Sequence, residues 1–243
     1  MNLKELINQS TYAPTGYVGS TNDLDKLEQY IIYNLSVLKE FKQIVIATNY
    51  SKPNSNRVSN EILWKRYFPD CILLHSNINR GHNFGTADLD NMVFDYCKEH
   101  NIEWLCKSDN DIILLPELLD KQVDEADFYY LNGIGCGGMV KYNFDFNRII
   151  NEDFYPQTWF YFVNVTRVDY LNNKQYIDKT YNQIQSVSNY NGKVWEYIDG
   201  WSCETFLRDC VKRNNLTKFH LIDQEKYIIL LEIVKAGNIH DCS

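Results

Sequence analysis

The chain has 243 residues, of which 44% are hydrophobic and 23% charged, and it is long enough for a globular protein to bury a large core. Its net charge is −8 and it contains no block of Lys and Arg, which argues against a surface that follows nucleic acid. We expect no membrane-spanning helix, because no stretch of about 18 apolar residues occurs.

The N-terminus lacks the apolar segment of a signal peptide, so we expect a cytoplasmic protein. The cysteine pattern agrees with this expectation. The seven cysteines are odd in number, and no Cys-x-x-Cys motif occurs among them. Several lie inside apolar patterns, which is typical of reduced core thiols in an intracellular protein.

Strands and helices alternate through the first 115 residues. In chain order the prediction is a strand at 3–11, a loop at 12–16, a helix at 24–38, a strand at 43–48, a helix at 61–67, a strand at 71–75, a helix at 86–100 and a strand at 104–109. This alternation predicts a parallel sheet with right-handed crossovers. Ligands of such sheets bind beyond the carboxyl ends of the strands.

The second half of the chain is less regular. Its predicted elements are a helix at 116–123, strands at 127–131 and 159–165, a helix at 202–214 and a strand at 218–222. Residues 172–194 are polar and are interpreted as a long excursion over the active face. The glycines at 133–138 do not form a P-loop, because no Gly-Lys-Ser/Thr follows them. We find no linker or repeat, and we expect a single domain over 1–243.

Two carboxylates lie at the end of the strand predicted at 104–109 and just beyond it. Asp109 and Asp111 flank Asn110, and side chains at i and i+2 beyond a strand end can turn towards one point. Carboxylate oxygens suit Mg²⁺ or Mn²⁺, and such an ion can carry the diphosphate of a nucleotide. The alternative is a solvated turn. An EF-hand is excluded, because Ile113 and Leu114 occupy places that need a ligand and a glycine.

The order of these motifs resembles the GT-A glycosyltransferases, nearest in style to family 2, with most of the likeness in residues 5–115. His82-Asn83-Phe84-Gly85 is similar to the Arg-Asn-x-Gly element of the family, and Asp109-Asn110-Asp111 to its metal-binding Asp-x-Asp. The stretch from Gly200 to Glu204 resembles the element that holds an acidic catalytic residue. Three features depart from the family pattern: His82 replaces arginine, Cys203-Glu204 replaces Glu-Asp, and the first strand is not the usual aliphatic run.

The resemblance implies a single GT-A (Rossmann-like) α/β domain, with a mixed, mostly parallel sheet and helices on both faces. Residues 1–115 would form the nucleotide-sugar half and residues 116–243 the acceptor half. It also implies the activity, which is transfer of a sugar from a nucleotide diphosphate donor, with UDP-sugar expected, to a hydroxyl of a carbohydrate or glycoconjugate.

The resemblance further implies a donor and metal site. Asp111 is expected to hold Mn²⁺ or Mg²⁺, Asp109 to contact ribose or metal, and His240 to complete the ligand set unless the tail is disordered. The remaining residues expected at the donor are Thr11, Tyr12, Arg80, Asn83, Gly85 and Asn110. Their alternatives stay open: Tyr12 as a core residue rather than a stack for the base, Arg80 as a surface residue rather than a phosphate contact, and Asn83 and Gly85 as a helix-entry turn.

Glu204 is the candidate general base on the acceptor side. It lies in the first turn of a predicted helix, where the macrodipole favours the carboxylate. It would accept the proton of the acceptor hydroxyl in an inverting displacement, with Asp199 in reserve. The alternative is an ordinary helix-start residue. Trp159, Trp195 and Trp201 could offer faces for sugar rings, and core packing is the default interpretation of each.

Two other functions remain open from the sequence. A sugar-phosphate nucleotidyltransferase uses a similar sheet and metal carboxylates, but it should carry a basic, Gly-rich loop after the first strand, and the stretch from Tyr12 to Gly19 contains no Lys or Arg. The other possible function is that of a non-catalytic carbohydrate-binding protein.

Overall fold

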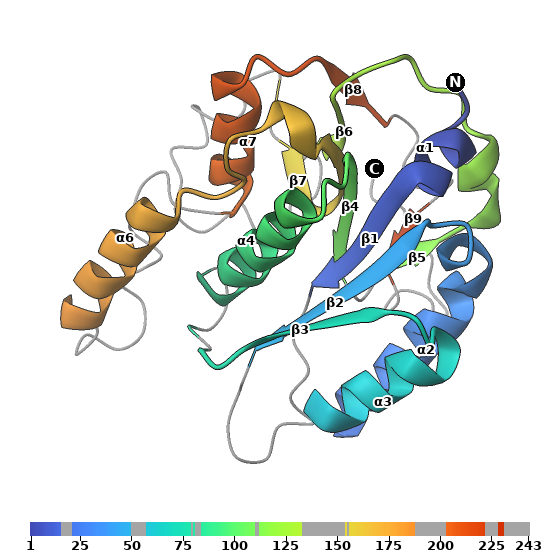
Figure 1. The fold of residues 1–243 in the computed structure, drawn as a ribbon, viewed down its shortest axis with the longest axis horizontal. Coiled ribbons are helices and arrows are strands. Elements are labelled where there is room, and N and C mark those ends of the chain that lie inside the picture. Colours follow the sequence, from blue (N-terminus) through green and yellow to red (C-terminus); the bar gives the residue numbers. More distant parts are fainter. Residues whose placement is uncertain are drawn as a thin grey trace.

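A computed structural model of the chain describes residues 1–15, 21–49, 57–78, 80, 84–109, 112–132, 154, 156–187, 203–221 and 228–230. The central strands are β1 (Ser10–Thr15), β2 (Gln43–Asn49), β3 (Ile72–Ser76), β4 (Trp104–Asp109), β6 (Phe128–Asn132), β7 (Pro156–Asn164) and β8 (Lys218–His220). They form one sheet in the order β3-β2-β1-β4-β7-β6-β8 (Figure 1). Only β7 runs antiparallel to its neighbours in this sheet, so the predicted mixed, mostly parallel sheet is confirmed.

The described helices cover both faces of this sheet. They are α1 (Leu3–Gln9), α2 (Thr21–Leu38), α3 (Arg57–Tyr67), α4 (Phe84–Glu99), α6 (Lys174–Val187) and α7 (Cys203–Arg213). In Figure 1, α2 and α3 lie on one side of the strands, and α4 and α7 lie on the other. Each side has its own apolar core. The Rossmann-like α/β class expected from the sequence is therefore observed.

The two cores follow from strand periodicity. Alternate residues of β2 point to opposite faces, so Ile44 and Ile46 join the core under α2, while Val45 and Ala47 join the core under α4. A strand covered on both faces needs apolar residues at every position, which explains its continuous apolar run.

The start of the chain corrects the prediction of a strand at 3–11. Leu3, Leu6 and Ile7 are fully buried at helical spacing, and the Asn2 side chain accepts a hydrogen bond from the Glu5 amide at 2.9 Å. This N-cap begins α1, so β1 starts only at Ser10.

The predicted loop at 12–16 is also wrong over its described part, because β1 continues through Pro14 to Thr15. Pro14 is tolerated there because the residue pairs between β1 and β2 end at Tyr12, whereas Pro14 lies beside Ser108 of β4. A proline that lacks a strand neighbour on one side leaves no ladder bond unmade on that side.

Two further elements differ from the sequence prediction. The helix expected at 116–123 is a short 3-10 helix, η1 (Pro116–Asp120), and most of the excursion expected at 172–194 is the helix α6. A second 3-10 helix, η3 (Val165–Arg167), follows β7. Outside the main sheet, β5 (Ile112–Leu114) pairs antiparallel with β9 (Ile228–Leu230). The other predicted helices and strands are confirmed with small shifts at their ends.

Four cysteines behave as core residues. Cys71, Cys97, Cys106 and Cys210 are buried free thiols. Burial raises the pKa of Cys97 and of Cys210 to about 12, because the thiolate would lose its hydration. None of the helices in the described part of the chain has the length and apolarity that a membrane span requires.

Asn34 fixes β5, the strand that follows the Asp109-Asn110-Asp111 motif. Its fully buried amide donates to the carbonyls of Tyr30 and Ile112 at 2.8 and 2.9 Å and accepts from the Leu114 amide at 2.5 Å. We expect Asn34→Leu to lower the free energy of unfolding by about 2–5 kcal/mol, because each unpaired buried backbone group costs about 1–3 kcal/mol. Urea denaturation measures this change.

The control for this prediction lies on the same helix. Ser36 is exposed on α2, so Ser36→Leu introduces the same side chain without removing an internal hydrogen bond, and its effect should stay within about 0.5 kcal/mol. Equal effects of the two variants would contradict a bridging role for Asn34.

Candidate functional site

The carboxyl ends of β1, β2, β3 and β4 meet at one edge of the sheet. Thr15 at the end of β1 aligns with Asp109 at the end of β4, and Asn49 aligns with Ser76 in the same way. This is the edge at which open α/β sheets bind ligands. Asp109 therefore lies where the sequence placed a site.

Lys107 is a residue at this edge that the sequence analysis does not predict. It lies on β4, and its side chain is only 2% exposed. Its ammonium group is 2.6 Å from Oδ1 of Asp109 and also donates to the backbone carbonyl of Thr158 on β7. Sequence reasoning missed Lys107, although a lysine within the apolar run of a predicted buried strand is a visible signal.

Asp109 is bound by Lys107 and remains partly exposed. Because Lys107 and Asp109 are two residues apart on one strand, their side chains leave the same face of the sheet. Lys107 binds Oδ1, while the Asp109 side chain remains 32% exposed. Within the described residues, no other side chain is seen to bind this carboxylate, so its second oxygen can meet a ligand.

Glu204 is connected to the same edge through β7. It lies in the first turn of α7, and its Oε1 accepts a hydrogen bond from the hydroxyl of Thr158 at 2.9 Å. Thr158 is 8% exposed, and its backbone carbonyl is the one that Lys107 binds. We call Lys107, Asp109, Thr158 and Glu204 the rim network. It links two carboxylates that the sequence proposed separately.

The prediction that Tyr12 stacks on a base needs correction. Tyr12 is fully buried, and its hydroxyl contacts the hydroxyls of Tyr30 on α2 and Ser108 on β4. The pKa of the Tyr12 hydroxyl lies well above its ordinary value, mainly because the group is buried and secondly because of the electrostatic effect of the nearby Tyr30. The alternative of a core tyrosine describes this residue. Thr11 is also buried, with 1% exposure, so neither side chain offers a face to a ligand.

Arg80 likewise differs from its predicted role as a phosphate contact. Its Nε donates to Asp88 of α4 at 2.7 Å, its Nη2 contacts the other oxygen of Asp88, and its Nη1 donates to Asp178 of α6 at 2.6 Å. The guanidinium also lies 5.1 Å from the centre of the Tyr181 ring. The bond to Asp88 raises the pKa of Arg80. Arg80 therefore joins α4 to α6, with its charge already paired.

Of the remaining predicted site residues, some lie within the ranges that the structure describes and the others lie outside them. Gly85 is buried in the first turn of α4, which begins at Phe84, two residues earlier than expected. Trp159 is half-buried on β7. The others lie outside the described residues: Asn83, Asn110, Asp111, Trp195, Asp199, Trp201 and His240.

A metal ion at this edge would meet one oxygen of Asp109. In the described ranges, no group of three His, Cys, Asp or Glu side chains gathers to hold an ion. The proposed partners Asp111 and His240 lie outside those ranges. Lys107 binds Oδ1 of Asp109, so Oδ2 is the oxygen to which Lys107 is not bonded.

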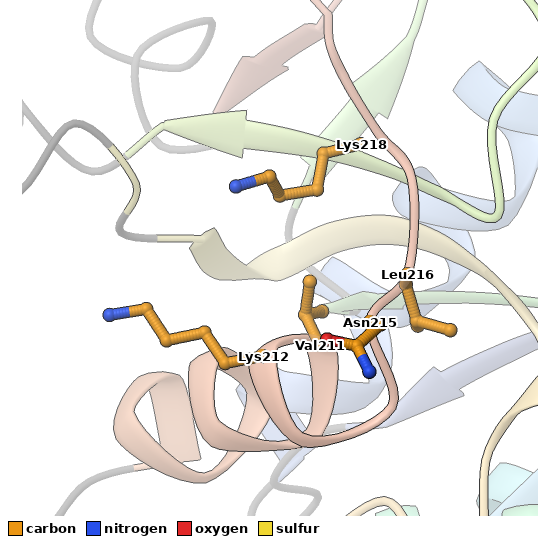
Figure 2. A pocket seen from close by; sticks show the side chains of 5 residues that line it. All are labelled: Val211, Lys212, Asn215, Leu216 and Lys218. Carbon is orange, nitrogen blue, oxygen red and sulfur yellow. The ribbon is translucent and has the colours of Figure 1, made fainter.

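A hollow of about 310 Å³ lies elsewhere, where α7 ends and β8 begins (Figure 2). Its lining residues are Val211, Lys212, Asn215, Leu216 and Lys218. Since β8 runs parallel to β6, and β6 and β4 both run antiparallel to β7, Lys218 at the start of β8 belongs to the opposite edge of the sheet from Asp109. This hollow is therefore separate from the rim network.

The chain was compared with known proteins. No protein-family model matches it, and no curated protein matches it. Among solved structures, it is similar to the nucleoside-diphosphate-sugar pyrophosphorylase from Vibrio cholerae RC9. The identity is 9%, the match covers 91% of this chain and 95% of that one, and the TM-score is 0.45.

Proposed function

We propose that the protein is a cytoplasmic, divalent-metal-dependent glycosyltransferase that takes a sugar from a nucleotide diphosphate donor, with UDP-sugar expected. One observation supports this proposal most strongly. The rim network joins Asp109, the proposed donor-side carboxylate, to Glu204, the proposed acceptor-side carboxylate, at the carboxyl end of β4. Glycosyl transfer needs two such groups, one for the leaving diphosphate and one for the attacking hydroxyl.

On the donor side, Oδ2 of Asp109 together with Asp111 and His240 is the proposed set that would hold Mn²⁺ or Mg²⁺. When bound, such an ion neutralises the diphosphate as it leaves. Lys107 keeps Asp109 in one orientation through Oδ1. Asn83, Gly85 and Asn110 remain proposed donor contacts from the sequence resemblance.

On the acceptor side, Glu204 is the proposed general base. The acceptor oxygen forms a bond to the anomeric carbon as the bond from that carbon to the diphosphate breaks, and the hydroxyl proton passes to Glu204. Thr158 donates to Oε1, and Oε2 is the oxygen proposed to take the proton. The N-terminal position on α7 favours the carboxylate that this role needs. Asp199 stays the reserve base.

The second candidate is sugar-phosphate nucleotidyl transfer, which the sequence leaves open as an alternative. The observation that favours keeping it is Lys107, a lysine ammonium beside a carboxylate at the sheet edge, since phosphate transfer also relies on a cation and a metal carboxylate. The absence of Lys and Arg from Tyr12 to Gly19 still weighs against it.

A thermal-shift panel of nucleotides, each with and without Mn²⁺, tests the proposal. At a concentration of about 100 times Kd, a ligand stabilises the folded state by about 2.7 kcal/mol. For a chain of this size that corresponds to a rise in Tm of roughly 5–10 °C. We expect this rise for UDP with Mn²⁺, little effect without the ion, and loss of the effect in Asp111→Ala.

Other outcomes point to other functions. A larger shift with nucleoside triphosphates than with UDP supports nucleotidyl transfer. No shift with any nucleotide supports a carbohydrate-binding protein without catalysis. An Asp111→Ala variant that keeps both Mn²⁺-dependent UDP binding and donor hydrolysis would contradict the proposed metal site.

A further inference from the structure

Lys107 breaks the pattern of the strand that carries it. Among the neighbouring positions of β4, Leu105 and Cys106 are buried apolar residues, and Lys107 is buried to the same extent. A charged group loses its hydration when it is buried, and pairing only partly restores that loss. Replacing a buried ion pair by apolar residues is often neutral or stabilising. Apolar packing of β4 therefore does not explain a lysine here.

The contacts of Lys107 indicate what the lysine does instead. Its ammonium binds Asp109 on its own strand and the carbonyl of Thr158 on the antiparallel neighbour β7. Thr158 then donates its hydroxyl to Glu204 on α7. Each proposed carboxylate is thus held by one oxygen, and the two holding residues are joined to each other.

We propose that Lys107 and Thr158 are positioning residues of the transfer reaction: Lys107 orients the Asp109 carboxylate towards the donor, and Thr158 orients the Glu204 carboxylate towards the acceptor. This inference rests on the proposed function and assigns a separate role to each of these two residues. Neither residue touches the reacting atoms. Loss of Lys107 should weaken donor binding, and loss of the Thr158 hydroxyl should slow the chemical step.

The test uses the full chain with UDP and MnCl₂ for binding. For turnover it uses hydrolysis of whichever UDP-sugar gives the largest thermal shift. We expect Lys107→Met to raise the Kd for UDP by about tenfold or more, since hydrogen bonds to charged groups contribute about 1.5–3 kcal/mol. Its Tm should fall by only a few degrees, because the buried carbonyl of Thr158 loses its donor while methionine fills the site and Asp109 remains partly hydrated. Lys98→Met, at an exposed lysine of α4, is the matched control.

Thr158→Val tests the acceptor side with almost no change in volume. We expect kcat for hydrolysis to fall about tenfold, from the loss of a hydrogen bond to a charged group. The donor KM should be unchanged, and Thr158→Ser should restore kcat. A purely structural role would change Tm without this separation of kcat from KM.

The outcomes separate this inference from the proposed function. If the parent protein binds no nucleotide with Mn²⁺, the proposed function fails and this inference fails with it. If the parent protein binds UDP, and Lys107→Met binds it within twofold, only the positioning role of Lys107 is overturned. A Lys107→Met chain that does not fold contradicts the premise that the fold tolerates losing the ammonium. An unchanged kcat in Thr158→Val overturns the role of Thr158.

Discussion

Replacing Asp109 with asparagine is expected to raise the Kd for UDP in the presence of Mn²⁺ by about 10- to 100-fold. The carboxylate is partly exposed at the end of β4, and its charge is what a metal ion or a ribose hydroxyl would meet. Charge-assisted hydrogen bonds contribute about 1.5–3 kcal/mol, and each 1.4 kcal/mol is about a tenfold change in Kd. Isothermal titration calorimetry measures the affinity directly.

Asparagine is the better substitution because it keeps an oxygen for Lys107. Alanine would remove the carboxylate partner of a buried ammonium, which costs on the order of 3 kcal/mol in stability and would confuse a binding defect with partial unfolding. Asp124→Asn provides the control, since Asp124 is an exposed carboxylate ahead of β6. Equal affinity for UDP in Asp109→Asn and the parent protein would remove Asp109 from the donor site.

Glu204→Gln is expected to lower kcat by about 10²–10⁴-fold, the range that general base catalysis contributes. Glutamine keeps an oxygen that can accept the Thr158 hydroxyl, so the packing of α7 against β7 is preserved. It cannot accept the proton of the attacking hydroxyl. Donor affinity should be unchanged, because Glu204 acts on the other side of the rim network. Steady-state hydrolysis of the UDP-sugar donor reports kcat and KM separately.

The control for this variant lies on the same helix. Asp209 on α7 has a side chain that is 62% exposed and pairs with Arg213 at 2.5 Å, so Asp209→Asn changes the helix charge equally without touching the rim network. We expect its kcat to match that of the parent protein. A loss of less than tenfold in Glu204→Gln would point to Asp199 as the base.

The candidate site was only partly visible in the sequence. Motifs in the sequence indicate Asp109 and Glu204 as candidates, because each lies in a recognisable local pattern. Lys107 and Thr158 were missed, because their roles come from the antiparallel pairing of β4 with β7, which joins distant parts of the chain. The predicted ligand roles of Tyr12 and Arg80 are wrong because a sequence does not reveal internal partners. Tyr12 contacts Tyr30 and Ser108, and Arg80 pairs with Asp88 and Asp178.

The sequence by itself determined the alternation of strands and helices and the mostly parallel sheet. These features depend on hydrophobic periodicity, which is a local property: β2 is apolar at every buried position, and α4 carries its apolar residues on one face. Only the tertiary structure decided that β7 runs antiparallel beside β4 and that a buried lysine joins Asp109 to Thr158. The physical reason is that burial and charge pairing depend on which distant segments of the chain pack together. The spacing of residues within one segment does not determine that packing.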